Sequence, residues 1–233
     1  MNQSQYPGTN HTSLAYSAQR LMPRVFGWMF AGLMMTAIIA LVLSGNPNVP
    51  YYLATHSGVF WGIVIAEFII VMALSSLLGR MSPFAATFSF FLYAALNGVT
   101  LSLILAYFNV QTVAAAFFIS AGMFGLFAAF GYVTKIDMTR FGSIALMLIL
   151  GLVLASVVNI FFVKSSMLDL IISYALVVLF CGVTAYDIQK IKAMSQQVYD
   201  EETGTKLAIF GALMLYLDFI IIFKNLLRIF SRD

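Results

Sequence analysis

Three acidic residues stand where a carboxylate is costly, inside or at the end of long apolar stretches. Glu67 lies in the middle of one stretch, and Asp218 is the only charged residue between Leu207 and Phe223. Asp187 ends a third stretch, shortly before Lys190. A carboxylate at the centre of a membrane helix costs about 2.5–3.5 kcal/mol on insertion scales. An acid at such a position is therefore a functional candidate that faces the bundle interior or a wet cavity.

Each acid also has an ordinary structural explanation. Asp187 is also consistent with an interfacial anchor paired with the lysine one turn further on. Glu67 is also consistent with an ion pair to Arg80 or Arg228, or with a protonated carboxyl hydrogen-bonded to a neighbouring helix. Asp218 is the hardest to explain in this way, because no basic residue shares its helical face within one turn.

The elements that position these acids follow from composition. The chain has 233 residues, of which 62% are hydrophobic and only 9% charged, so it cannot coat a water-facing globule. Each of its apolar blocks has about the 20 residues that a helix needs to cross about 30 Å of hydrocarbon. We predict an all-α, polytopic integral membrane protein, a seven-transmembrane-helix bundle over 21–233 after a disordered polar tail at 1–20. The expected spans are 25–45, 58–79, 84–107, 111–134, 142–163, 168–188 and 207–226.

The positive charges predict the orientation. With seven crossings, most Lys and Arg fall on the side of the N-terminus, and Lys164 is the exception among the loops. The N-terminus is therefore expected in the cytoplasm. Lys224, Arg228 and Arg232 would then lie outside, so either late charges are tolerated or the last block re-enters and returns. Seven full spans are the favoured interpretation.

Several chemistries are excluded by what the sequence lacks. The single cysteine, Cys181, excludes an internal disulfide and a cysteine-based zinc site, and His11 and His56 have no third ligand at metal spacing. No GxSxG, Walker or GxGxxG pattern occurs. Lys and Arg are scattered, so nucleic acid is not an expected partner. We expect no enzyme activity and no cofactor.

Five short segments carry a resemblance to a known family. Taken together they closely resemble the Bax inhibitor-1 (transmembrane BAX inhibitor motif) family, in its bacterial YbhL/YccA-like branch, from about Arg20 to the C-terminus. The segments are GMFG at 122–125, GYVTK at 131–135, GVTAYDIQK at 182–190, GALMLYLDF at 211–219 and LRIF at 227–230.

The resemblance implies a bundle with a central last helix that acts as a pH-sensitive calcium leak, here in a bacterial inner membrane. It implies that Asp187 and Asp218 form a di-aspartyl sensor, with calcium as ligand or permeant ion. In that family an arginine of the second helix latches the pore, for which Arg80 is the nearest candidate. Glu67 and Arg228 match an acidic second-helix position and a basic position after the seventh helix.

Elementary electrostatics supports such a sensor. Two carboxylates a few ångströms apart in a low dielectric repel each other and titrate as a unit. When deprotonated they offer an oxygen-rich site that suits a hard cation such as Ca²⁺. Protons and calcium should therefore compete. The sign of the pH effect on flux depends on whether the latch or the ion site dominates.

Two other function classes stay open. The chain is also consistent with a non-conducting regulator that binds other membrane proteins, such as a quality-control protease or a death-pathway factor. An intramembrane aspartyl protease would use the same two acids. That class needs Gly-x-Gly-Asp and a later Pro-Ala-Leu, whereas Tyr216 and Leu217 precede Asp218 here and no proline follows Pro83.

Overall fold

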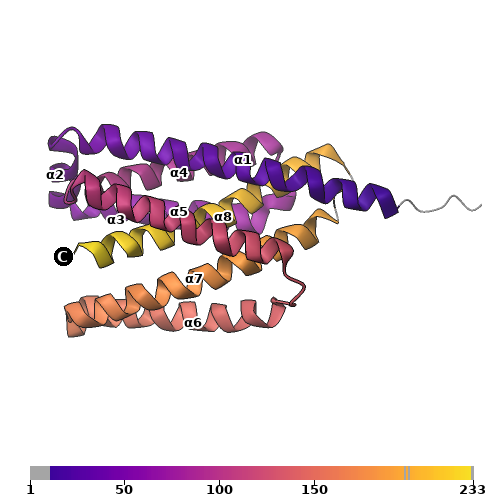
Figure 1. Ribbon diagram of the computed structural model, residues 1–233. Coiled ribbons are helices and arrows are strands. Elements are labelled where there is room, and N and C mark those ends of the chain that lie inside the picture. Colours follow the sequence, from indigo (N-terminus) through magenta and orange to yellow (C-terminus); the bar gives the residue numbers. More distant parts are fainter. Residues whose placement is uncertain (1–10, 197, 199, 232–233) are drawn as a thin grey trace, which may run out of the picture.

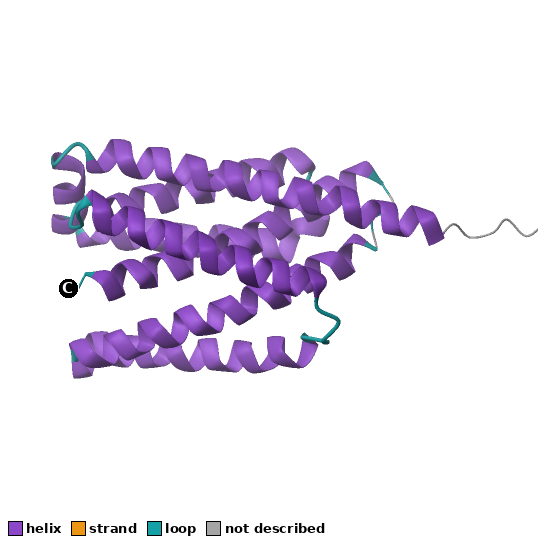
Figure 2. Ribbon diagram, viewed as in Figure 1, coloured by secondary structure: helices purple, strands orange, loops and turns teal. Residues whose placement is uncertain are grey.

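The computed structural model describes residues 11–196, 198 and 200–231, and these residues form helices and short connections without any strand (Figure 2). Seven helical segments are long and apolar enough to cross a membrane. The predicted fold class, an all-α polytopic membrane protein, is confirmed. The elements are α1 (His11–Ser44), α2 (Asn48–Thr55), α3 (Ser57–Leu77), η1 (Leu78–Arg80), α4 (Pro83–Leu105), α5 (Val110–Val133), α6 (Thr139–Val158), η2 (Asn159–Val163), α7 (Ser166–Ser195) and α8 (Glu201–Phe230).

The last helix, α8, is the centre of the bundle. It packs against α1, α4, α5 and α7, and Figure 1 shows it running between them. Apart from Asp218 and the Tyr216 hydroxyl, its middle section is apolar on every face, and Leu213, Leu215 and Ile222 are buried. A helix that is apolar all round is stable only when it is enclosed by protein or lipid. α1, α4, α5 and α7 therefore enclose α8, while α3 and α6 lie outside, with Leu74 and Ala145 as their only buried residues.

Side-chain caps begin four of the spans. Ser82, Asn109, Ser165 and Asp200 each accept a hydrogen bond from a backbone N–H in the first turn of α4, α5, α7 and α8. These caps satisfy donors that the helix itself leaves without partners. The spans therefore begin at definite residues and are joined by short connections, which makes consecutive helices antiparallel.

The helices extend further than the apolar blocks that predicted them. α1 begins at His11, inside the segment assigned to the polar tail, of which residues 1–10 lie outside the described part. α7 continues to Ser195 and α8 begins at Glu201, so most of the long loop expected between the last two spans is helical. Apolar residues mark only the part of a helix that lies within the hydrocarbon of the bilayer. The helix itself continues into water as long as its backbone hydrogen bonds are formed.

The last helix is continuous from one end of the bundle to the other, as Figure 1 shows. α8 passes without a break from the end of the bundle where α1 starts to the opposite end. At a rise of about 1.5 Å per residue such a helix exceeds the thickness of the hydrocarbon core. A continuous helix of this length does not turn back on itself, which favours a full crossing over the re-entrant alternative.

Candidate functional site

Asp187 and Asp218 come together at the contact between α7 and α8. Both are buried, with 8% and 3% of their surface exposed, and Asp187 lies near enough for its charge to act on the Asp218 carboxyl. Lys190 also acts electrostatically on Asp187, but no ion pair within 4.0 Å joins them among the described residues. Two acids from adjacent spans therefore share one buried region inside the bundle.

Asp218 is only partly satisfied by its neighbours. Its Oδ2 atom has no hydrogen-bond partner among the described residues. The Thr184 hydroxyl, one turn before Asp187 on α7, lies within hydrogen-bonding reach of the Asp218 carboxyl and donates to the Phe180 carbonyl at 2.8 Å. A hydroxyl has one proton and can serve only one of these acceptors at a time. The site therefore keeps an acceptor oxygen open.

Close glycine contacts fix the part of α7 that carries Asp187. A Cβ atom at Gly131 of α5 would overlap the backbone of Ala185, and one at Gly142 of α6 would overlap the Tyr186 ring. Gly182 of α7 in turn leaves room for the Phe141 ring. α7 is thus held between α5 and α6 over the turn before Asp187, because three glycines allow the helices to approach closely.

An amide clamp holds the same end of α7. The Gln189 side chain donates to the Ile136 carbonyl at 2.8 Å and accepts from the Met138 N–H at 3.2 Å, which ties the α5–α6 connection to α7. Lys192 donates to the Tyr132 carbonyl at 3.3 Å. These bonds lie directly after Asp187, so both sides of that acid are fixed.

Glu67 lies in a separate polar region, on α3. Its carboxylate accepts a hydrogen bond from Thr100 of α4 at 3.0 Å and interacts electrostatically with Lys224 of α8. The expected ion pairs to Arg80 or Arg228 are not formed. Arg228 pairs with Asp169 at 3.2 Å, and Arg80 is exposed at the end of η1 without an ion pair among the described residues. The alternative of a hydrogen bond to a neighbouring helix describes Glu67 better.

A buried hydroxyl cluster joins three helices beside this region. Thr36 of α1 donates to the Ala94 carbonyl at 2.8 Å and lies 2.6 Å from the Tyr216 hydroxyl of α8. Because Thr36 has a single proton, Tyr216 must be the donor in the shorter contact. On α4, Asn97 donates to the Tyr93 hydroxyl at 3.1 Å, while its Oδ1 has no partner among the described residues.

Sequence reasoning missed two members of these sites. Lys224 was treated only as one of the late positive charges, although it lies inside the last expected span, 207–226. Thr184 carried no signal beyond its position one turn before Asp187 on the same helical face. Its role depends on the contact between α7 and α8, which no local pattern contains.

The Asp187–Asp218 pair offers few ligands of its own to a metal ion. No group of three His, Cys, Asp or Glu side chains gathers anywhere in the described ranges. Two carboxylates and a hydroxyl supply oxygen only, and Ca²⁺ prefers oxygen and takes six to eight ligands. Backbone carbonyls and water would have to complete the shell, so the donor chemistry fits a passing calcium ion better than a permanently held one.

Comparison with known proteins supplies an independent finding. The family model described as "Inhibitor of apoptosis-promoting Bax1" matches residues 18–233. The chain is 42% identical to the inner membrane protein YbhL of Escherichia coli (strain K12) over 215 residues, 91% of this chain and 92% of the relative. It is 39% identical to an uncharacterized protein of Borreliella burgdorferi over 210 residues, 90% of each chain. It is 32% identical to an uncharacterized membrane protein of Streptococcus pyogenes serotype M1 over 225 residues, 96% of this chain and 97% of the relative.

Proposed function

Because the chain belongs to the Bax inhibitor-1 family, we propose that it is a pH-sensitive calcium leak whose sensor is the Asp187–Asp218 pair. The membership confirms the resemblance drawn from the sequence motifs. A relative named as an inner membrane protein supports placing this chain in a bacterial inner membrane. The excess of Lys and Arg on the side of the N-terminus supports a cytoplasmic N-terminus.

One observation carries the proposal: the Asp218 carboxyl is almost fully buried, lies beside a second acid and has an oxygen to which no described residue donates a hydrogen bond. A structural acid inside a membrane protein is normally paired with a cation or fully hydrogen-bonded, because an open charge there is costly. Such an arrangement costs stability, which favours a role in binding a proton or a cation.

Protons and calcium would exchange at this pair. A proton shared between the two carboxyl groups removes their repulsion, whereas their deprotonation leaves two negative groups that attract a divalent cation. The two ligands bind the same oxygens and exclude each other. The calcium concentration for half-maximal binding must therefore rise as pH falls.

The position of the pair links its state to the bundle. α8 packs on four spans, so a change in the distance between Asp187 and Asp218 is felt at α1, α4 and α5 as well as at α7. Packed interfaces of this kind move between discrete arrangements rather than deforming continuously. We infer that the protonation state of the pair selects between a closed and a conducting arrangement of α8.

The test is calcium flux into liposomes that contain purified protein with both Asp187→Asn and Asp218→Asn. Asparagine keeps the shape and removes the titrating group, so the flux should lose its pH dependence. The matched control is Asp169→Asn, an acid on the first turn of α7 that pairs with Arg228 outside the site, and it should keep the wild-type pH profile. Thermal unfolding in detergent checks that all variants fold.

Three results would overturn the proposal. An unchanged pH profile in the double variant would remove the sensor. Wild-type flux no greater than that of protein-free liposomes would favour the non-conducting regulator. If the wild-type protein cleaves a peptide bond and either substitution abolishes that cleavage, the protein is an intramembrane protease instead.

A further inference from the structure

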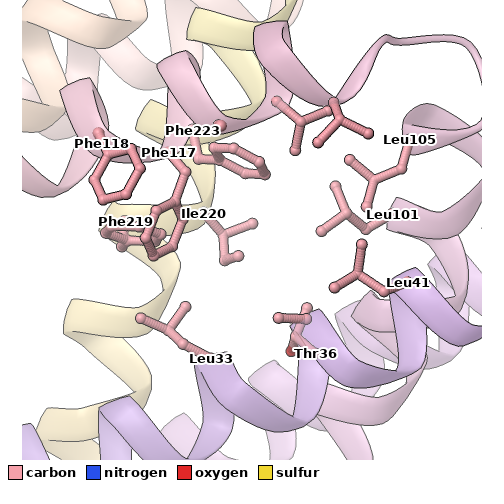
Figure 3. A pocket seen from close by; sticks show the side chains of 14 residues that line it. Leu33, Thr36, Leu41, Leu101, Leu105, Phe117, Phe118, Phe219, Ile220 and Phe223 are labelled. Carbon is pink, nitrogen blue, oxygen red and sulfur yellow. The ribbon is translucent and has the colours of Figure 1, made fainter.

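A cavity of about 270 Å³ lies between α1, α4, α5 and α8, away from the Asp187–Asp218 pair. Figure 3 shows the labelled side chains surrounding an open centre, with Phe219, Ile220 and Phe223 contributed by α8. The acids are not among its lining residues. We call this space the α1–α5 cavity.

The α1–α5 cavity has no polar group to offer to water. Thr36 is its one hydroxyl-bearing lining residue, and that hydroxyl donates to Ala94 and accepts from Tyr216. A water molecule in a protein interior needs two to four polar partners, and an apolar cavity of about 150 Å³ stays dry and takes up an apolar ligand. The space therefore suits an apolar occupant rather than an ion or water.

The cavity opens onto the surface that faces hydrocarbon. α1 and α5 flank it without packing closely on each other. Its lining includes Leu41, Val110 and Phe118, whose exposed fractions are 61%, 80% and 72%. In a chain that spans a bilayer, side chains so exposed on spanning helices are covered by lipid. The cavity is thus continuous with the lipid-facing surface.

The opening also lies near one end of the spans. Leu105 is the last residue of α4, Val110 is the first of α5, and Leu41 is close to the end of α1. This is the depth at which a phospholipid chain leaves its headgroup and enters the hydrocarbon.

We propose that an acyl chain of a bilayer phospholipid enters the α1–α5 cavity and rests against Phe219 and Ile220 of α8. A helix of a second copy is about 10–12 Å across, so a cavity of about 270 Å³ does not hold it. Residues 1–10 of the chain are mostly polar, so their composition does not suit an apolar cavity. The occupant touches α8 at the residue next to Asp218, but its presence does not depend on calcium flux.

Fluorescence quenching by phospholipids with brominated acyl chains tests this directly. Trp28 and Trp61 are first replaced by Phe, so that each variant carries one tryptophan. Phe219→Trp places the probe against the cavity at a position that is only 4% exposed. We expect its fluorescence to be quenched as strongly as that of Leu150→Trp, which stands on the lipid-facing surface of α6 and is 58% exposed.

Two controls separate the cavity from general lipid exposure. Phe180→Trp, 7% exposed on α7 and not part of the cavity lining, should stay bright in the same lipids. Ala114→Phe fills the cavity and should remove the quenching of Phe219→Trp. Where Phe219→Trp fails to fold, Phe223→Trp gives the same measurement from the next turn of α8.

The proposal fails if the probe at position 219 stays as bright as the probe at position 180, because the cavity then holds no lipid chain. It fails equally if Ala114→Phe leaves the quenching unchanged, because bromine then reaches position 219 by another route. Quenching at 219 that Ala114→Phe abolishes supports it. The calcium measurements are separate, so either proposal stands or falls without the other.

Discussion

The two basic side chains near the end of α8 each lie beside an acid from a distant part of the chain. Lys224 and Arg228 would lie outside under the favoured orientation, against the usual distribution of positive charge. Lys224 interacts with Glu67, and Arg228 pairs with Asp169. These late charges are therefore tolerated because acids from α3 and α7 offset them. At the Asp187–Asp218 pair, Lys190 acts on Asp187, whereas the described residues place a second acid and no basic group beside Asp218.

The Glu67–Lys224 interaction makes a prediction about stability. Lys224→Met leaves the Glu67 charge without its cation and should lower the free energy of unfolding by about 1–3 kcal/mol, in the range of coupled neighbouring residues. Glu67→Gln combined with Lys224→Met should cost less than the sum of the two single changes. Thermal unfolding in detergent micelles measures the cycle. Lys135→Met, at an exposed loop position, is the control and should be nearly neutral; additivity would contradict the interaction.

For single residues, the sequence predicts whether an acid lies inside a membrane span better than it predicts which side chains contact that acid. The apolar flanks of Glu67 and Asp218 were enough to mark both as acids inside a span. Of the two alternatives for Glu67, the ion pair to Arg80 or Arg228 was wrong, because those residues were judged by type and approximate depth, whereas the hydrogen bond to a neighbouring helix is present. The actual neighbours, Thr100 and Lys224, depend on how α4 and α8 rotate in the bundle.

Glycine residues allow α7 to pack closely against its neighbours α5 and α6. At Gly131 a side chain would meet the backbone of Ala185, and backbone cannot move aside as a flexible side chain can. The contact brings α5 against the turn of α7 that precedes Asp187. The position of this acid is therefore set by a neighbouring helix as well as by its own.

Gly131→Ala should separate α5 from α7 and lower the free energy of unfolding by about 1–3 kcal/mol, the usual cost of overpacking. Gly125→Ala is the matched control, since it stands on the same helix and a Cβ there would meet nothing within 4 Å. That control should be neutral or stabilising by up to about 1 kcal/mol, because alanine favours helix. Denaturation curves in one detergent compare them, and equal effects would disprove the close contact.

The start of α8 carries a pH dependence outside the membrane. Hydrogen bonds from the Thr203 backbone N–H and hydroxyl hold the pKa of Asp200 below its usual value. A lowered folded-state pKa stabilises the helix start above the unfolded value, about 3.9, and this contribution is lost as pH falls through the folded value. Protection of the Thr203 amide from hydrogen exchange should therefore fall below about pH 4.

Asp200→Asn provides the control for that measurement, because it keeps a capping oxygen without a titrating group. Its amide protection should not change across the same pH range. A wild-type amide whose protection ignores pH would show that the carboxylate does not cap α8.

The extent of each element was harder to predict than its existence. Seven apolar blocks identified seven spans, but the blocks ended where polar residues began, and α7 and α8 continue beyond them. The short helix α2 lies between the first two expected spans and was not predicted. Pro47 is its N-cap and Pro50 lies in its first turn, where a missing N–H costs little.

For the whole molecule the odd number of spans puts the two ends of the described chain at opposite ends of the bundle (Figure 1). The native Cys181 is buried and should not react with a thiol reagent, so any labelling comes from a cysteine introduced elsewhere. With the N-terminus in the cytoplasm, α2 and the end of α8 should both face outward, and the α5–α6 connection inward.

Labelling of intact cells with a membrane-impermeant maleimide tests that topology. Asn48→Cys and Ser231→Cys should react in intact cells. Ile136→Cys, 65% exposed in the α5–α6 connection, should react only after the membrane is opened. The reverse pattern would invert the orientation, and a protected Ser231→Cys beside a reactive Asn48→Cys would contradict a full crossing by α8.

The most direct test of the central claim is calcium flux through the wild-type protein in liposomes, measured against calcium concentration at a series of pH values. Exchange of protons for calcium at Asp187 and Asp218 predicts that the calcium concentration for half-maximal flux rises steadily as the pH is lowered. A half-maximal concentration that stays constant over the whole series would contradict it.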